Sequence, residues 1–367
     1  MNRVWRRWLT AIAVVILTPS VWNLAPAHSA PTSGATSPST YAVGLARCVF
    51  VDGSRTVLNF ATNPASTWRD ERRLVTEIRY PVNRLNYPAK ETAGAVPEAK
   101  LGGYPTVIFA HGYDVTPDLY AALLDAWVRA GYVVVAPWFP DEVASAVAEQ
   151  HGVNTEGDLA NEPADLAFVA KSAISAAAGT STGCSILRGL VDASRLAFAG
   201  HSDGATAVGM LMYDHGLDPQ GVNYASLRTG LHVGAVMIFS GSEDTHQAFA
   251  TPAAHPALLV VHSLGDTCNP LSNGRLLYDQ VHQGDKWFLE LQKAHHLPPF
   301  DGTDVAAFRV VSTTSILFLQ SALGLSMGTQ NLTTSFNPEP AVAQLFHANP
   351  GPPLPPTFKT VRSCSRN

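Results

Sequence analysis

The sequence lacks the motifs that mark several large classes of proteins. It contains no H-E-x-x-H or C-x-x-C motif, so we predict no metal site. It also contains no G-x-G-x-x-G segment and no P-loop, so no nucleotide is implied and we expect no cofactor. Charged residues make up only 14% of the chain, and the formal net charge is −5. That balance argues against a protein that binds nucleic acid, which usually presents a basic face.

Apolar residues, by contrast, are plentiful. The chain has 367 residues, of which 46% are hydrophobic and 9% aromatic, so it can build a substantial core. This length suits one large α/β domain or two ordinary domains. Four cysteines allow two disulfides in three different connectivities, among which the sequence does not choose. They are Cys48, Cys184, Cys268 and Cys364.

Residues 1–29 have the three-part pattern of a secretory signal peptide. Three arginines precede an apolar run from Leu9 to Leu17, and small residues near Ser29 suit cleavage. The run is too short for a comfortable membrane span, although an uncleaved anchor is the alternative interpretation. We therefore predict a secreted protein, extracellular or associated with the cell envelope. It would have no membrane span once the signal is removed, and disulfides are plausible there.

The rest of the chain reads as a linker, a folded domain and a tail. Residues 30–40 are small and polar and predict a flexible linker, residues 41–323 form the domain, and residues 324–367 are irregular and Pro-rich. Buried strands alternate with helices in the domain, which predicts an α/β fold with a mostly parallel central sheet and helices on both faces. The expected strands are 48–60, 74–80, 106–110, 132–136, 195–199, 233–239, 258–262 and 287–291, and the expected helices are 117–130, 163–178, 203–213, 271–283 and 304–323.

The sharpest signal is the pentapeptide Gly200-His201-Ser202-Asp203-Gly204. The pattern G-x-S-x-G arises often by chance, but here it directly follows a predicted strand and opens a predicted helix. This context is that of a nucleophile elbow, in which the serine occupies a strained turn between strand and helix. Ser202 is therefore the candidate nucleophile. A glycine-rich turn with a capping serine is the alternative.

Two backbone N–H groups are candidates for an oxyanion hole. One belongs to Asp203, the residue after the nucleophile, and the other to Tyr113, in the loop after strand 106–110. The Asp203 carboxylate is interpreted as favourable placement at a helix N-terminus. His111 is interpreted as a residue that orients the loop through a hydrogen bond.

A nucleophilic serine needs a base, and the base needs an acid that orients it. In this architecture the acid follows the serine along the chain, and the histidine comes last. Asp266 follows strand 258–262, so it would lie at the carboxyl edge of the sheet, where active sites of open α/β sheets gather. Glu243 and Asp244 are rival acids, for which a surface loop is the plainer interpretation.

The candidate bases are His295 and His296, which follow strand 287–291. That strand end comes next along the chain after the one carrying Asp266, so an acid and a base can meet there. Spacing alone does not decide which of the two histidines is the base.

These residues together resemble the α/β-hydrolase superfamily. Within it they look most like secreted bacterial esterases of the cutinase-like polyester hydrolase and platelet-activating-factor acetylhydrolase kind. The last of the four stretches that carry the resemblance is similar to a pattern in which the base is followed by a bulky apolar residue, a spacer and proline, and on that register His296 is the base. The four stretches are AHGYDVT (110–116), GHSDG (200–204), GDTCNP (265–270) and AHHLPPF (294–300).

Two features depart from the family pattern. The position after the nucleophile is usually apolar in polyester hydrolases and is Asp203 here, and residues 141–158 read as an inserted flap over the site. Both bear on the substrate class rather than on the chemistry. Trp138 and Phe139 are candidate pocket walls, with packing in the core as the equal alternative.

The resemblance implies a secreted serine hydrolase that cleaves carboxylic esters through an acyl-enzyme. Ser202 would attack, His296 would act as base, Asp266 would orient it, and the N–H groups of Tyr113 and Asp203 would bind the oxyanion. The implied partner is a small-molecule, lipid or polyester ester, and the protein is expected to be a monomer. Alternatives are an acyltransferase with the same triad, a non-catalytic binding protein on the same fold, and a peptidase.

Overall fold

The computed structural model describes residues 41–88, 90–150, 156–181, 183–214, 216–241, 256–282, 284–325, 332 and 337–348. Contacts divide the chain into two units, residues 1–37 and residues 38–367, and every described residue lies in the second. The predicted signal peptide and linker, together with Cys364, lie outside the described residues.

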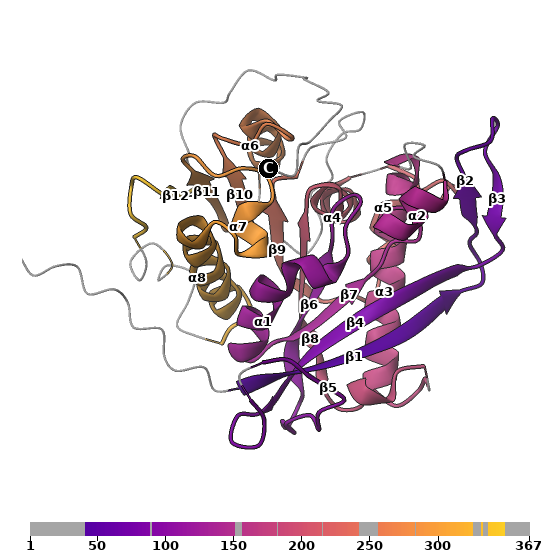
Figure 1. Ribbon diagram of the computed structural model, residues 1–367, viewed down its shortest axis with the longest axis horizontal. Coiled ribbons are helices and arrows are strands. Elements are labelled where there is room, and N and C mark those ends of the chain that lie inside the picture. The colour runs from indigo at the N-terminus through magenta and orange to yellow at the C-terminus, as the bar shows by residue number, and fades with distance from the viewer. Residues whose placement is uncertain are drawn as a thin grey trace, which may run out of the picture. The chain divides into compact units, whose positions relative to one another are not determined.

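A ten-stranded sheet forms the centre of the domain, in the order β12-β11-β10-β9-β8-β6-β7-β4-β1-β5 (Figure 1). Neighbouring strands are parallel from β7 through β6, β8, β9 and β10 to β11. Strands β1, β4 and β7 pair antiparallel, and so do β11 and β12 at the other edge. The strands are β1 (Tyr41–Asp52), β4 (Arg72–Asn83), β5 (Thr92–Ala93), β6 (Tyr104–Ala110), β7 (Val133–Pro137), β8 (Val191–His201), β9 (Val233–Phe239), β10 (Ala257–Ser263), β11 (Lys286–Leu291) and β12 (Ala343–His347), with a separate hairpin of β2 (Val57–Asn59) and β3 (Ser66–Arg69).

Helices cover both faces of this sheet because successive side chains of a strand point to opposite sides. In β6, Val107 and Phe109 join a core with α1 and α8, whereas Ile108 and Ala110 join a core with α3, α4 and α6 (Figure 1). The prediction of a mostly parallel sheet with helices on both faces is therefore confirmed. The helices are η1 (Pro117–Tyr120), α1 (Ala121–Arg129), α2 (Ala144–Glu149), η2 (Glu156–Asn161), α3 (Glu162–Ala177), η3 (Ser185–Leu187), α4 (Asp203–Tyr213), α5 (Tyr224–Leu227), α6 (Leu271–Gln280), α7 (Pro298–Asp301) and α8 (Val305–Ala322).

The first predicted strand, residues 48–60, has the wrong limits. Strand β1 begins at Tyr41 and ends at Asp52, and a turn then separates it from β2. The Asp52 carboxylate makes this turn, since it accepts hydrogen bonds from the Ser54 backbone N–H at 2.9 Å and from Arg55 Nε at 2.7 Å. Residues 52–56, DGSRT, are polar and begin with the turn dipeptide Asp-Gly, so the sequence did carry a signal that the single long strand overlooked.

The segment predicted to be irregular, residues 324–367, contains a strand. Strand β12 pairs antiparallel with β11, and the ring of His347 stacks on Trp287 with centroids 4.6 Å apart. Five residues, AQLFH, are too short for a clear periodic signal, and pairing with an existing sheet edge is what makes them a strand.

Helix α8 is the one helix among the described residues that is long and apolar enough to cross a membrane, as judged by length and composition. One side of it belongs to the core, where Val310, Val311, Phe318 and Leu319 are buried. This packing is ordinary for the core helix of a sheet-centred domain.

A disulfide joins Cys48 in β1 to Cys184, just before η3, with Cα atoms 5.5 Å apart. It joins two positions 136 residues apart in the sequence and ties the first strand to the segment that leads into β8. Cys268 is also disulfide-bonded. Disulfides of this kind are typical of oxidising compartments.

Candidate functional site

Ser202 lies at a sharp turn between β8 and α4. Its backbone adopts φ 56° and ψ −123°, and residues other than glycine rarely adopt a positive φ. This is the strained turn that the sequence pattern predicts, and it presents the hydroxyl beyond the carboxyl end of the strand.

The two glycines of the pentapeptide allow this turn. A Cβ on Gly200 would lie 2.3 Å from the Gly204 carbonyl oxygen, and a Cβ on Gly204 would lie 2.3 Å from the His111 carbonyl oxygen. Strand β8, helix α4 and the loop after β6 therefore approach one another more closely than any side chain permits.

Ser202, His296 and Asp266 form one hydrogen-bonded chain. His296 Nε2 lies 2.9 Å from Ser202 Oγ, and His296 Nδ1 lies 2.8 Å from Asp266 Oδ2. The carboxylate must accept, so Nδ1 carries the proton and Nε2 is left to accept the proton of the serine hydroxyl. The exposed His295 takes no part in this chain.

Backbone N–H groups hold the side chain of Asp266, the candidate acid, in place. Asp266 is 7% exposed, and its Oδ1 accepts hydrogen bonds from the N–H groups of Cys268 and Asn269 at 2.9 and 3.0 Å. Burial disfavours the charged carboxylate, but the hydrogen bond and charge of His296 outweigh it and hold the pKa of Asp266 below its usual value. Asp266 therefore stays ionised and oriented toward His296.

The loops that carry the acid and the base touch directly. Ser263, the last residue of β10, donates its hydroxyl to the Ala294 carbonyl at 2.6 Å. A Cβ on Gly265 would lie 2.8 Å from the carbonyl oxygens of Ala294 and Lys293, so only glycine allows this approach. Neighbouring parallel strands β10 and β11 thus bring Asp266 and His296 together, as expected for the carboxyl edge of a sheet.

The candidate oxyanion donors lie on either side of Ser202. Asp203 opens α4, so its N–H has no carbonyl partner earlier in the helix. The loop after β6 packs against the nucleophile, since a Cβ on Gly112 would lie 3.0 Å from Ser202 Cβ.

His111 orients the peptide that bears the Tyr113 N–H. Its Nδ1–H donates to the Gly112 carbonyl at 2.8 Å, and its Nε2 accepts from the Phe139 N–H at 3.0 Å. In a trans peptide the Gly112 carbonyl and the Tyr113 N–H point in opposite directions, so binding the one aims the other. Burial lowers the pKa of His111 to about 4, which keeps this ring neutral.

Several predicted residues lie elsewhere or outside the described part of the chain. Glu243 and Asp244, the rival acids, fall on residues that the structure does not describe. Phe139 is fully buried and packs on the His111 ring with centroids 4.8 Å apart, which is the core role considered for it. The Trp138 indole N–H donates to Glu77 at 3.2 Å.

Sequence reasoning missed a buried acidic cluster near Asp203, the residue after the candidate nucleophile. Glu142 and Glu162 are fully buried and their carboxyl groups interact with each other, and no other hydrogen-bond partner of these oxygens lies within the described residues. Burial, reinforced by neighbouring acids, raises the pKa of both carboxyl groups well above the usual value. The feature of the sequence that could have revealed this cluster is the high density of acidic residues between positions 141 and 165.

Part of the predicted flap, residues 141–158, belongs to this cluster. Asp141 and Glu142 at its start and Asp158 at its end are fully buried. Asp158 pairs with the buried Arg72 of β4 at 2.7 Å, and Asp165 of α3 pairs with the same guanidinium at 2.6 Å. The Asp158 end of the segment is therefore anchored to the sheet.

Asp203 does not benefit from the helix N-terminus as predicted. Its Oδ2 is buried and has no hydrogen-bond partner within the described chain. Burial, followed by the negative charge of Glu156, raises the pKa of Asp203 to about 7. The carboxyl is therefore largely neutral below that pH.

Asp203→Asn is expected to change the pH dependence of ester hydrolysis. If the Asp203 N–H binds an oxyanion as the sequence predicts, the ionised wild-type carboxylate would oppose that charge above pH 7, and the ratio of variant to wild-type kcat/KM should rise about 10-fold between pH 6 and 9. Because a raised folded-state pKa penalises the ionised folded protein, the variant should also gain stability as pH rises from about 4 to 7, and keep it above. Initial rates and thermal unfolding across pH measure both.

Glu156→Gln is the matched control for this prediction. It removes the exposed charge that helps raise the pKa of Asp203, so the alkaline decline should move to lower pH. A ratio of rates that does not change with pH would contradict the interpretation.

One group of potential metal ligands gathers among the described residues, formed by Asp266, Cys268 and His296, with ligand atoms within 4.8 Å of one another. Cys268 is disulfide-bonded and offers no thiolate, while Asp266 and His296 are hydrogen-bonded to each other. Their chemistry is that of an acid–base pair and does not suit a metal ion.

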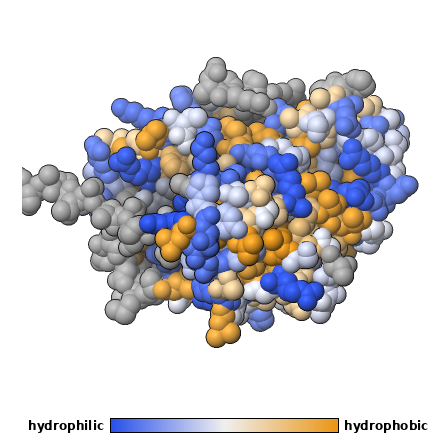
Figure 2. Space-filling model, turned by 60° about the horizontal axis from the view of Figure 1, so that its bottom comes forward, coloured by the Kyte–Doolittle hydropathy of each residue, from blue (hydrophilic) through white to orange (hydrophobic). Residues whose placement is uncertain are grey.

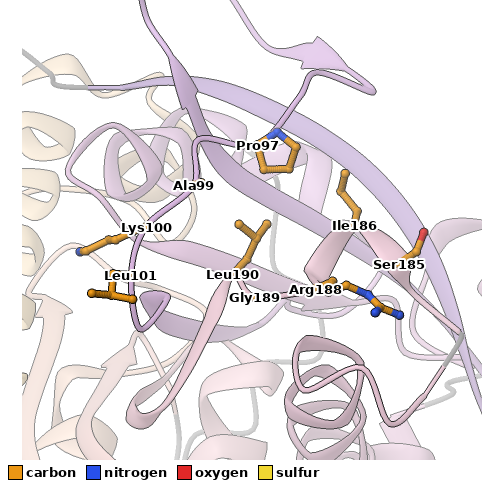
Figure 3. Close-up of a pocket in the computed structure, with 9 residues that line it drawn as sticks. All are labelled: Pro97, Ala99, Lys100, Leu101, Ser185, Ile186, Arg188, Gly189 and Leu190. Atoms are coloured by element: carbon orange, nitrogen blue, oxygen red, sulfur yellow. The ribbon is translucent and has the colours of Figure 1, made fainter.

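A pocket lies at the opposite ends of the strands from Ser202. It is formed by the segments that lead into β6 and β8, and includes Lys100, Leu101, Arg188 and Leu190 (Figure 3). Figure 2 brings the end of the domain with β5 toward the viewer and shows apolar residues in patches beside hydrophilic ones. Since Ser202 follows the carboxyl end of β8, this pocket is separate from the candidate active site.

Comparison with protein families finds a match over part of the chain. Residues 72–227 match the chlorophyllase family, from β4 to α5, and so include Tyr113, Ser202 and Asp203 but end before Asp266 and His296. No curated protein matches the sequence. The sheet order and this match together show an α/β-hydrolase fold. The narrower resemblance to cutinase-like polyester hydrolases and platelet-activating-factor acetylhydrolases finds no support in these comparisons.

Proposed function

We propose that this chain, with its α/β-hydrolase fold and its similarity to an ester hydrolase family, is a secreted serine hydrolase that cleaves carboxylic esters. The observation that carries the proposal is the hydrogen-bonded chain from Ser202 through His296 to Asp266, placed at a strained strand–helix turn. This geometry serves nucleophilic catalysis and has no evident purpose in a packed core.

In the proposed mechanism Ser202 Oγ attacks the ester carbonyl while His296 Nε2 takes its proton. Asp266 holds the ring in the Nδ1–H tautomer and stabilises its charged form. The resulting tetrahedral oxyanion accepts hydrogen bonds from the Tyr113 and Asp203 N–H groups, each of which typically contributes about 3–4 kcal/mol. His296 then protonates the leaving alcohol.

The second half of the reaction releases the acyl group. Water takes the place of the alcohol and attacks the acyl carbonyl while His296 takes its proton. The bond to Ser202 Oγ then breaks, His296 returns the proton to Oγ, and the carboxylic acid leaves. The disulfides of Cys48, Cys184 and Cys268 support export, which the N-terminal pattern also predicts.

The test is hydrolysis of p-nitrophenyl esters from acetate to palmitate by the mature protein, together with labelling by a fluorophosphonate probe. Hydrolysis with labelling at Ser202 is expected, and the chain-length profile separates small-ester from lipid-like substrates. Absence of both turnover and labelling would overturn the proposal and favour a binding protein on the same fold.

A further inference from the structure

Two buried side chains next to the Ser–His–Asp chain connect the three loops that must act together. Tyr120, at the end of η1, lies 3.2 Å through its hydroxyl from the Gly112 N–H. The same hydroxyl lies 2.8 Å from His201 Nδ1, and His201 Nε2 lies 3.0 Å from the His296 carbonyl oxygen. The connection therefore runs from the oxyanion loop, through the residue before the nucleophile, to the base.

The direction of each hydrogen bond follows from the groups at the two ends. The His296 carbonyl can only accept, so His201 Nε2 carries the proton and Nδ1 is an acceptor. The Tyr120 hydroxyl must then donate to His201 Nδ1, and its oxygen is left to accept from the Gly112 N–H. A single arrangement of protons satisfies all three bonds.

The surroundings keep this arrangement in place. Tyr120 is 1% and His201 is 2% exposed, and the His201 ring packs between those of His296 and Phe300 with centroids 4.6 and 4.7 Å away. Burial, with the added charge of His296, holds the pKa of His201 well below its usual value. The ring therefore stays neutral, as the hydrogen-bond directions require.

We propose that Tyr120 and His201 are positioning residues that set the spacing between the oxyanion loop and the base, an inference that rests on the proposed function. Tyr120 holds the peptide N–H of Gly112, one residue before the candidate donor Tyr113. His201 holds the backbone of His296 itself. Neither side chain needs to touch the reacting atoms.

The first test is Tyr120→Phe, which removes one hydroxyl and two hydrogen bonds without leaving a large cavity. We expect kcat for p-nitrophenyl ester hydrolysis to fall about 10- to 100-fold, because small displacements of catalytic groups cost rate steeply. KM should change by less than about threefold, since substrate binding is not altered.

Tyr132→Phe is the matched control. Tyr132 is also fully buried, but its hydroxyl has no hydrogen-bond partner within the described residues, and it lies just before β7 at the far end of the strand from Ser202. Its loss should leave kcat within about twofold of wild type.

Two substitutions at His201 separate the halves of the connection. In His201→Gln the amide nitrogen replaces Nε2 and keeps the bond to the His296 carbonyl, whereas in His201→Asn the amide oxygen replaces Nδ1 and keeps the bond from Tyr120. Each should retain part of the activity, and His201→Leu should lose more than either.

A spectroscopic measurement distinguishes positioning from simple stability. The ¹⁵N shifts of His201 in wild type should report a protonated Nε2 and an accepting Nδ1, and Tyr120→Phe should shift the Nδ1 resonance while the protein remains folded. A Nδ1-protonated His201 in wild type would overturn the proposal.

The outcomes also separate this proposal from the proposed function. Wild-type turnover with unchanged kcat in Tyr120→Phe and His201→Leu would overturn the positioning roles alone. Wild-type protein that neither hydrolyses esters nor reacts with the fluorophosphonate at Ser202 would overturn both.

Discussion

Ser202→Ala is expected to lower kcat for p-nitrophenyl ester hydrolysis by roughly 10⁶-fold. The substitution removes the oxygen that lies 2.9 Å from His296 Nε2, so no acyl-enzyme can form. KM should change little, because the oxyanion donors and the substrate-binding surface remain. Covalent labelling by the fluorophosphonate, followed by intact mass, should be lost along with turnover.

The fold should survive this change, since alanine removes one partly exposed hydroxyl. Ser226→Ala in α5 is a suitable control, because it removes the hydroxyl of an exposed serine that bonds only locally, to the Asn223 carbonyl at 2.6 Å. Full turnover in Ser202→Ala would place the nucleophile elsewhere.

Asp266→Asn is expected to lower kcat about 10⁴-fold. The Oδ1 position faces two backbone N–H groups, from Cys268 and Asn269, so the amide of the variant must turn its carbonyl toward them. Its NH₂ group then faces His296 Nδ1, which becomes an acceptor. The remaining proton of the neutral ring moves to Nε2, and His296 can no longer accept the Ser202 proton.

The measurement is steady-state kinetics together with ¹⁵N spectroscopy of His296, which should show the proton moving from Nδ1 to Nε2. Asp218→Asn provides a matched control, because Asp218 is also buried and its Oδ1 likewise accepts two backbone N–H groups, from Gln220 and Val222. That variant should keep wild-type kcat. A loss of activity in Asp266→Asn below 10-fold would contradict the role of the acid.

Local patterns in the sequence determined the elbow. A strand, a serine between two glycines and a following helix are contiguous in the chain, so Ser202 and the positions of Gly200 and Gly204 could be predicted without any long-range contact. The positions of the strand ends could be predicted nearly as well, because alternating buried strands and helices imply a parallel sheet whose carboxyl ends share one edge. Asp266 and the neighbouring pair of histidines follow from that rule.

Tertiary structure alone decided which side chains reach the site. His295 and His296 are adjacent in sequence, and only the turn between β11 and α7, tied to Ser263 by the Ala294 carbonyl, directs His296 to Ser202. The strand β12 exists because an edge of the sheet was available to pair with it.

The environment of Asp203 shows the same division between sequence and structure. Its position at a helix start was evident from the sequence. The pKa of its carboxyl, however, depends on burial and on Glu156, which belongs to an earlier and separate segment of the chain. The connection through Tyr120 and His201 likewise joins residues 81 positions apart. Sequence patterns record neighbours along the chain, whereas desolvation and hydrogen bonding depend on neighbours in space, and only the fold determines those.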